Sequence, residues 1–415
     1  MQLHVSSPRS IRLKPTARRA ARTANTLRNV LAGLCVLGCS SGLQAQTSLD
    51  AMLKAEGQRA NFPALAAAVM VKGQLVAVGT AGTRRAGVEI PVTRDDRFHL
   101  GSDTKAMTAL LAAMMIEDGK LKWDSTLAQV FPELAARMDG PQHVTITQLL
   151  SHTSGLPADN QAFGELMLST AMQPGNLDEQ RYWMLQQIIA KPLEAEPGTR
   201  FAYSNLGYTV AGAVIERVSG KSWEELMVEH IFTPLNLKTA GLGPQATMGR
   251  IDAPLGHRVV DGKLRPVLSG PEADNPPIMG PAGTAHMSVL DFARWGSWVA
   301  GQGQRAPHLV KPATLKKLVT PVIATPLAST ASTTVSGAAQ YALGWGIVNV
   351  SWASKPLVFH GGSNTMNKAH IWVDTQRDAT IAIVTNIATP NTEDVMMNLA
   401  GKLYADFVAG SAPRK

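Results

Sequence analysis

Strand-like segments lie at both ends of this chain, and a long helical stretch separates them. Near the N-terminus, residues 64–82 are typical of a β-hairpin broken at Lys72-Gly73. From 104 to about 290 the pattern is mostly helical. Strand patterns then return at 342–350, 357–360, 369–373 and 380–385. The sequence therefore predicts an α/β (α+β) fold, in which a mixed antiparallel-sheet domain with flanking helices is assembled from both ends and an all-α domain is inserted.

The size of the chain supports this division. Its 415 residues, 45% of them hydrophobic, can bury a large core. We expect a leader at 1–45 and one folded domain at 46–415. Within that domain the α/β part is predicted at about 46–110 and 290–415 and the helical part at about 111–289, with helices at 49–60 and 392–408 flanking the sheet. A cleft is expected where the two parts meet.

Ser102-Asp103-Thr104-Lys105 is the only Ser-x-x-Lys sequence in the chain. Gly101 precedes it and strong helix formers follow, so Ser102 is predicted to open a helix. The free N–H groups at a helix start favour negative charge, which suits a serine that attacks a carbonyl. The amine of Lys105 lies on the same helical face and can take the proton of the hydroxyl. An N-capping serine followed by an exposed lysine is the alternative.

Tyr203-Ser204-Asn205 precedes a second helix, predicted at 206–218. A phenol in this place can relay a proton between Ser102, Lys105 and a leaving group. The Asn205 amide can hold a substrate carbonyl or the lysine. An ordinary helix cap made by Ser204 or Asn205 is the alternative.

The third element is Val358-Phe359-His360-Gly361-Gly362-Ser363-Asn364, in which an apolar approach ends in two glycines. Glycines allow a substrate to lie against the edge of a strand. The backbone N–H of Ser363 is predicted to pair with that of Ser102 as a two-donor oxyanion hole. On its own, His-Gly-Gly is typical of a turn, which is the alternative.

In this order the three elements resemble those of the serine β-lactamase and penicillin-binding-protein superfamily, most closely the class C β-lactamase-like branch with family VIII carboxylesterases and D-aminopeptidases. The resemblance covers nearly all of the chain after its leader, and 147–157, 197–208, 231–235, 281–284 and 344–346 share in it. It implies a β-lactamase/transpeptidase-like fold. It also implies that Ser102, Lys105 and Tyr203 are catalytic and that substrate is bound by Asn205, His360, Gly361, Gly362 and Ser363.

The third element departs from the family pattern. β-Lactamases and DD-peptidases usually carry Lys-Thr-Gly or Lys-Ser-Gly where this chain has His360-Gly361-Gly362. A lysine there is cationic and holds a substrate carboxylate, whereas a histidine with a pKa near the reference value of about 6.5 is mostly neutral at pH 7. The middle residue also lacks a hydroxyl. Both differences favour small esters and amides over penicillins and cephalosporins.

The formal net charge of +8 comes almost entirely from the leader. Seven Lys and Arg residues precede Asp50, the first acidic residue, so the rest of the chain is nearly neutral and is not expected to bind nucleic acid. An apolar segment at 30–37, followed by small residues, is typical of a secretory signal peptide. Cleavage after Ala45 is one expectation, and a lipobox at 36–39 that leaves Cys39 lipidated is the other.

These leader features predict a periplasmic or secreted protein that contacts a membrane only through such a lipid anchor. Both cysteines, Cys35 and Cys39, lie in the leader, so the folded part is predicted to have no disulfide and no cysteine nucleophile. The leader sequence Gly38-Cys39-Ser40-Ser41-Gly42 matches the nucleophile elbow of α/β-hydrolases, but no strand precedes it and no helix follows it.

Neither a cofactor nor a metal is expected. The ten histidines are scattered without metal-ligand spacing, and there is no phosphate-binding glycine loop or dinucleotide fingerprint. His152 is predicted to hold its own loop rather than to line the cleft. The sequence thus predicts an exported serine hydrolase that forms an acyl-enzyme on Ser102, with Lys105 and Tyr203 as its proton-transfer pair, and hydrolyses small esters or amides.

Two alternatives remain open at this point. Within hydrolases, the alternative is a β-lactamase or peptidoglycan DD-peptidase, which would turn over cephalosporins or a D-Ala-D-Ala peptide. The alternative of another class is a penicillin-type binding protein that is acylated without turnover.

Overall fold

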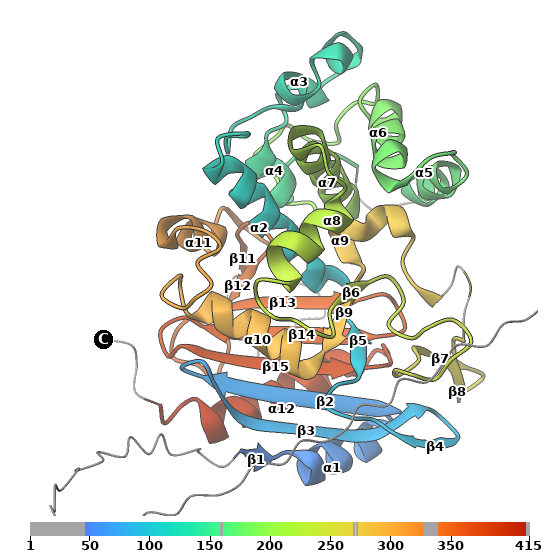
Figure 1. Cartoon of the computed structure of the whole chain (residues 1–415), viewed down its shortest axis with the longest axis vertical. Coiled ribbons are helices and arrows are strands. Elements are labelled where there is room, and N and C mark those ends of the chain that lie inside the picture. The colour runs from blue at the N-terminus through green and yellow to red at the C-terminus, as the bar shows by residue number, and fades with distance from the viewer. Residues whose placement is uncertain (1–45, 158–160, 269, 271–272, 327–338, 412–415) are drawn as a thin grey trace, which may run out of the picture. The chain divides into compact units, whose positions relative to one another are not determined.

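The computed structural model describes residues 46–157, 161–268, 270, 273–326 and 339–411 (Figure 1). These residues belong to one compact unit, Gln44–Lys415. The predicted signal peptide, its two cysteines and the elbow-like sequence lie outside the described residues. None of the helices that are described is both long and apolar enough to cross a bilayer.

One sheet joins the two ends of the chain. Its strand order is β1-β3-β2-β15-β14-β13-β12-β11-β10, with β4 paired to β3. Strand β2 (Ala64–Val71) pairs antiparallel with β15 (Ala379–Thr385), so early and late strands lie side by side (Figure 1). The predicted mixed α/β fold is therefore confirmed. The other strands are β1 (Thr47–Ser48), β3 (Gln74–Arg85), β4 (Val88–Pro91), β10 (Ile323–Ala324), β11 (Gln340–Tyr341), β12 (Gly346–Val348), β13 (Leu357–Ser363) and β14 (Lys368–Asp374).

Both faces of the sheet are covered, which explains why β2 is apolar throughout. Leu65, Ala67 and Val69 belong to the core shared with α1 (Asp50–Ala60) and α12 (Thr392–Phe407). The alternate residues Ala64, Ala66 and Ala68 belong to the core shared with α2 (Thr104–Glu117) and α10 (Val289–Ala300). Side chains alternate between the faces of a strand, so a strand buried on both sides carries no polar alternation.

The helical part packs on α2. Residues Thr104–Met115 of this helix are all buried, as expected for a helix that lies between the sheet and the other helices. Helix α7 (Asn205–Ser219) packs against it and is buried from Leu206 to Glu216. The remaining helices are α3 (Leu127–Val130), α4 (Ile146–Leu150), α5 (Gln161–Ala171), α6 (Leu177–Ile188), α8 (Trp223–Met227), α9 (Gly280–Gly283) and α11 (Pro312–Leu318).

The stretch 104–290 is less uniformly helical than its sequence predicts. It contains four short strands, β6 (Gly241–Leu242), β7 (His257–Val260), β8 (Lys263–Pro266) and β9 (Ala285–Ser288). Strand β9 pairs with β5 (Arg97–His99), which leads into the Ser-x-x-Lys segment. Strands of two to four residues are too short to show a two-residue period, so sequence patterning misses them.

The strand predicted at 342–350 is wrong as a continuous element. The chain turns between β11 and β12, where the Ala342 N–H donates to the Trp345 carbonyl at 2.7 Å. Gly344 has a φ of +79°, and a Cβ there would lie 2.9 Å from the Lys105 carbonyl oxygen. The turn therefore needs a glycine at position 344, where the backbone passes close to α2.

Candidate active site

Ser102 lies on a 3-10 turn, Gly101–Asp103, that leads directly into α2. Gly101 has a φ of +53°, and a Cβ at this position would lie 2.3 Å from the Ser363 backbone nitrogen. Only glycine fits a backbone approach this close. The Thr104 hydroxyl donates to the Gly101 carbonyl at 2.6 Å and fixes the turn from its other side. The predicted helix start is thus a short turn pressed against β13.

Lys105 extends from α2 to Ser102 and is completely buried. Its Nζ lies 3.0 Å from Ser102 Oγ, 2.6 Å from Asn205 Oδ1 and 2.7 Å from the Ala282 carbonyl oxygen. Both Asn205 Oδ1 and the Ala282 carbonyl can only accept hydrogen bonds. A neutral amine has two N–H groups to donate to them, and its lone pair then faces the serine hydroxyl. The geometry suits an amine that takes the proton of Ser102.

Burial keeps the groups around this amine uncharged. It lowers the pKa of His360 to about 3, with the charge on Lys105 as a further cause. It also lowers the pKa of His152 well below the ordinary histidine value and raises the pKa of Asp103 well above the ordinary carboxyl value.

Tyr203 stands at the edge of the site and is 36% exposed. Lys105 Nζ lies 4.7 Å from the centroid of its ring. The next residue, Ser204, caps α7 through a hydrogen bond that its hydroxyl accepts from the Gly207 N–H at 3.1 Å. The helix cap that was the alternative interpretation is therefore present, and it places Tyr203 and Asn205 on either side of the lysine amine.

His152 stacks against Tyr203, with ring centroids 4.3 Å apart. Its Nδ1 accepts the Ser204 N–H at 3.1 Å, and its carbonyl accepts the Ala202 N–H at 2.8 Å. It therefore joins its loop to the segment that carries Tyr203, in agreement with the loop-holding role that we predicted.

His360, Gly361 and Gly362 form part of strand β13 and not a turn, so the alternative interpretation of this sequence is wrong. Strand β12 pairs with β13 only from Leu357 to Phe359. Beyond this point the Ser102 turn takes its place beside β13. A Cβ on Gly362 would lie 2.6 Å from the Ser102 backbone nitrogen. In the same way, a Cβ on Gly101 would lie close to the Ser363 backbone nitrogen. The two backbone N–H groups predicted as oxyanion donors are thus brought into one small region.

The pKa of His360 is lower than the reference value used in the sequence analysis, but the ring is neutral at pH 7, as expected. It is 5% exposed, and its Nε2 lies 3.0 Å from the Tyr341 hydroxyl. Its Nδ1 lies 3.0 Å from the Gly361 carbonyl oxygen, which can only accept, so Nδ1 donates and Nε2 accepts from the tyrosine. A ring engaged in this way supplies no positive charge for a substrate carboxylate.

Sequence reasoning missed two tyrosines of this site. Tyr208 donates to the Leu150 carbonyl at 2.6 Å, and its ring centroid is 5.5 Å from Lys105 Nζ. Tyr341 stacks on His152 at 4.8 Å. Three of the five tyrosines in the chain thus gather here, and their scarcity was the only signal that could have pointed to Tyr208 and Tyr341.

We expect Gly362→Ala to lower the rate of acyl transfer to Ser102 by at least about 100-fold, because the predicted oxyanion donors depend on the contact between the Ser102 turn and β13. The added Cβ would meet the Leu100 carbonyl oxygen at 1.8 Å, which forces the two backbones apart. Gly361→Ala is the matched control, since its Cβ would meet the side chains of His370 and Phe359 at 3.2 Å and should cost less. Steady-state kinetics of both variants check this. Equal losses in the two variants would contradict the argument.

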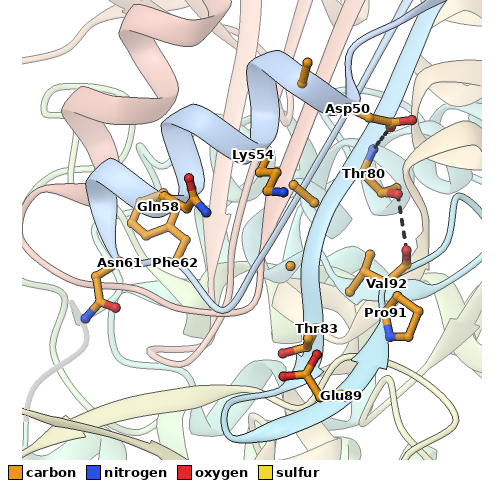
Figure 2. Close-up of a pocket in the computed structure, with 14 residues that line it drawn as sticks. Asp50, Lys54, Gln58, Asn61, Phe62, Thr80, Thr83, Glu89, Pro91 and Val92 are labelled. Carbon is orange, nitrogen blue, oxygen red and sulfur yellow. Dashed lines mark hydrogen bonds between the residues drawn. The ribbon is translucent and has the colours of Figure 1, made fainter.

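Two of the larger hollows in the described residues lie outside the cluster of Ser102, Lys105 and Tyr203. One, of about 850 Å³, lies between α1 and the β3–β4 hairpin and includes Lys54, Phe62 and Glu89 in its wall (Figure 2). None of the predicted site residues lines it. The other, of about 390 Å³, is lined by Leu177, Leu242, Pro244, Asp274, Asn275, Pro277 and Thr284 among others. It adjoins the Ser102 turn, because a Cβ on Gly283 would lie 3.4 Å from the Gly101 carbonyl carbon.

No group of three or more His, Cys, Asp or Glu side chains is placed to hold a metal ion in the part of the chain that the structure describes.

Comparison with known proteins agrees with this architecture. Residues 49–406 match the Beta-lactamase family. Penicillin-binding protein 4 of Amycolatopsis lactamdurans is 27% identical over 356 residues, which are 83% of this chain and 86% of that protein. A second curated relative, Protein flp of Staphylococcus aureus (strain MW2), is longer, and the chain covers 63% of its length at 22% identity.

Solved structures share the fold. EstCE1, described as a hydrolase with promiscuous acyltransferase activity, has a TM-score of 0.68 at 19% identity, over 83% of this chain and 96% of its own. D-amino acid amidase from Ochrobactrum anthropi SV3 has a TM-score of 0.66 at 18% identity, over 86% of this chain and 97% of its own. The family match spans nearly all of the described residues, and the chain belongs to the beta-lactamase family of serine hydrolases.

Proposed function

We propose that the protein is an exported serine hydrolase that acts on small esters or amides through an acyl-enzyme on Ser102. The observation that carries this proposal is the buried Lys105 amine, 3.0 Å from Ser102 Oγ and held by Asn205 and Ala282. A serine hydroxyl attacks a carbonyl poorly until a base takes its proton. The proposal assigns this role to Lys105, because its amine lies within hydrogen-bond distance of the hydroxyl.

The steps follow from this arrangement. Lys105 takes the Ser102 proton as Oγ attacks the substrate carbonyl carbon, and the N–H groups of Ser102 and Ser363 stabilise the oxyanion. The tetrahedral species collapses to an ester of Ser102, and the leaving group takes a proton from Lys105 by way of Tyr203. Water then gives a proton to the same pair as it attacks the acyl carbon, and the bond to Ser102 Oγ breaks as Oγ takes up that proton, which releases the acid and restores the free serine.

The substrate class follows from the neutral His360. A substrate held by its carboxylate needs a cation where the family usually has lysine, and a histidine with a pKa of about 3 does not supply one at neutral pH. Small esters and amides need no such anchor. A D-amino acid amidase and a hydrolase with promiscuous acyltransferase activity share the fold, which supports the proposal.

The proposal is tested by initial rates of the purified protein on p-nitrophenyl butyrate, an amino acid amide, nitrocefin and a D-Ala-D-Ala peptide. We expect turnover of the ester or the amide, and at least about 100-fold lower kcat/KM for nitrocefin and the peptide. The opposite preference would support a β-lactamase or DD-peptidase, which the name of the Amycolatopsis relative makes the second candidate.

A pH profile tests the state of His360. Because burial lowers its pKa to about 3, the ring is neutral from pH 5 to pH 8 and its charge does not change in this window. We expect wild type and His360→Gln to have kcat/KM profiles of the same shape between these pH values, whatever their absolute rates. A step near pH 6.5 in the wild type that the variant lacks would mean that His360 titrates normally and can bind a carboxylate when protonated.

Export is part of the proposal and rests on the leader at 1–45. Expression of the full chain in a Gram-negative host, followed by fractionation and intact mass measurement, tests it. We expect periplasmic or secreted protein that begins at Gln46, or a lipidated form that begins at Cys39. Cytoplasmic protein with an intact leader would contradict this part alone.

A further inference from the structure

His99 and Asp274 form a buried pair beside the Ser102 turn, and the proposed chemistry does not yet use it. His99 ends strand β5, and Asp274 lies in the loop before α9. Their side chains are 0% and 7% exposed, and His99 Nε2 lies 2.5 Å from Asp274 Oδ1. The ring N–H does not point straight at this oxygen, so the pair makes a close contact between a carboxylate and an imidazole rather than a linear hydrogen bond.

The other ring nitrogen of His99 holds the nucleophile turn. Its Nδ1 accepts the backbone N–H of Gly101 at 3.0 Å. Because Nδ1 accepts, the ring proton of the neutral histidine is on Nε2, the nitrogen that faces the carboxylate. The bond from Gly101 therefore sets the tautomer, the Asp274 carboxylate lies against the nitrogen that carries the proton, and the ring holds the peptide unit that precedes Ser102.

The same carboxylate oxygen also reaches the strand on the other side of the oxyanion region. Asn364 Nδ2 lies 3.4 Å from Asp274 Oδ1, and the Asn275 N–H donates to that oxygen at 2.7 Å. Asn364 directly follows Ser363, and its Oδ1 accepts from the N–H and the side-chain amide of Asn367 at 3.1 and 2.9 Å. One oxygen atom thus links the turn that carries Ser102 to the turn that follows Ser363.

Stability alone does not explain a carboxylate in this place. Among the atoms that the structure describes, Asp274 Oδ2 is buried and has no hydrogen-bond partner. A buried polar atom without a partner costs about 1–3 kcal/mol, and more when it is charged. A residue that only filled this space would avoid that cost. The presence of a carboxylate at position 274 is explained if its contact with His99 has a role in function.

We propose that His99 and Asp274 are positioning residues that hold the backbone N–H groups of Ser102 and Ser363 at the spacing an oxyanion requires. This inference rests on the proposed acyl transfer at Ser102. Oxyanion donors stabilise the transition state only when they are fixed before the charge develops, and a lost donor costs about 10²–10³ in kcat. The pair acts through Gly101 and Asn364.

Asp274→Asn and His99→Gln test this role. Each keeps most of the volume of the side chain, and each breaks the link between the carboxylate and Gly101. We expect kcat for p-nitrophenyl butyrate to fall about 30- to 100-fold in both variants while KM stays within about threefold, because substrate binding does not need the oxyanion donors. The pH profile should keep its shape, since Lys105 and Tyr203 are unchanged.

Asp378→Asn is the matched control. Asp378 is also a largely buried carboxylate, paired with Arg305 at 2.7 Å, but it lies in the turn between β14 and β15 at the other end of the sheet. Its φ of +54° is one that asparagine tolerates. We expect this variant to lose about as much thermal stability as Asp274→Asn and to keep wild-type kcat. An equal fall of kcat in the control, or kcat within twofold of wild type in Asp274→Asn and His99→Gln, would overturn the proposal.

Hydrogen exchange provides a readout that needs no substrate. We expect exchange in a peptide covering residues 98–103 to be at least about tenfold faster in Asp274→Asn and His99→Gln, and unchanged in Asp378→Asn. Unchanged exchange in the first two variants would refute the positioning role, even if no substrate is known. Faster exchange together with a wild-type protein that hydrolyses nothing would leave the positioning role standing and reject the proposed hydrolase function.

Discussion

Ser102→Ala should reduce ester turnover by about 10⁴-fold or more, the largest effect that we expect from a single substitution. The variant lacks the Ser102 hydroxyl, which lies 3.0 Å from Lys105 Nζ and would form the acyl-enzyme. Ser102 is half-buried on a short turn, and loss of its hydroxyl leaves that turn with its Thr104 and Gly101 contacts. The fold should therefore persist.

The measurement is steady-state turnover of p-nitrophenyl butyrate together with a thermal melt. Ser363→Ala is the matched control, because it removes a hydroxyl on β13 but keeps the backbone N–H that the oxyanion would use. We expect the control to retain most of its activity. Turnover by Ser102→Ala within tenfold of wild type would place the nucleophile elsewhere.

Lys105→Met should have the second largest effect, a loss of about 10³-fold in kcat, because it removes the base and keeps an unbranched side chain of similar length. Lys105→Arg gives the matched comparison, since arginine retains a positive charge but cannot accept a proton at neutral pH. Both variants should be about equally inactive if the lysine acts as a base. Recovery of activity in Lys105→Arg would mean that charge alone is what Ser102 needs.

Lys105→Met should also be less stable than the wild type. It leaves Asn205 Oδ1 and the Ala282 carbonyl without the amine that bonds them at 2.6 and 2.7 Å. Each buried acceptor left unpaired costs about 1–3 kcal/mol. Thermal melts separate the loss of stability from the loss of kcat. They give the fraction of the variant that is folded at the assay temperature, and the observed rate is divided by this fraction.

Local sequence signals predicted the parts of the site that depend on local backbone. Ser102 and Lys105 are joined by a single turn, so their spacing alone brings the amine to the hydroxyl. Tyr203 and Asn205 flank a serine that caps the next helix, and their positions follow from that cap. The assembly of the sheet domain from both ends of the chain also followed from where strand patterns lie, although the pairing of β2 with β15 was not predicted.

Contacts between distant segments could not be predicted in this way. Asp274 meets His99 across a large part of the chain, and neither residue belongs to a recognisable spacing. The hydrogen bond between Tyr341 and His360 joins two segments of the sheet that are separated by the turn at Gly344, where the backbone passes close to α2. The pKa of His360 is lowered by burial, which depends on the packing of the folded chain. The sequence alone therefore allowed only the reference pKa of histidine to be assumed.

The central claim is that Ser102 carries an acyl group during turnover, and mass spectrometry of a quenched reaction tests it most directly. Wild-type protein is mixed with excess p-nitrophenyl butyrate, quenched in acid within the first turnovers, digested and mapped. The account predicts a butyryl group on the peptide that contains Ser102, and its absence in Ser102→Ala. Turnover without any acylated peptide, or acylation of another residue that persists in Ser102→Ala, would contradict it.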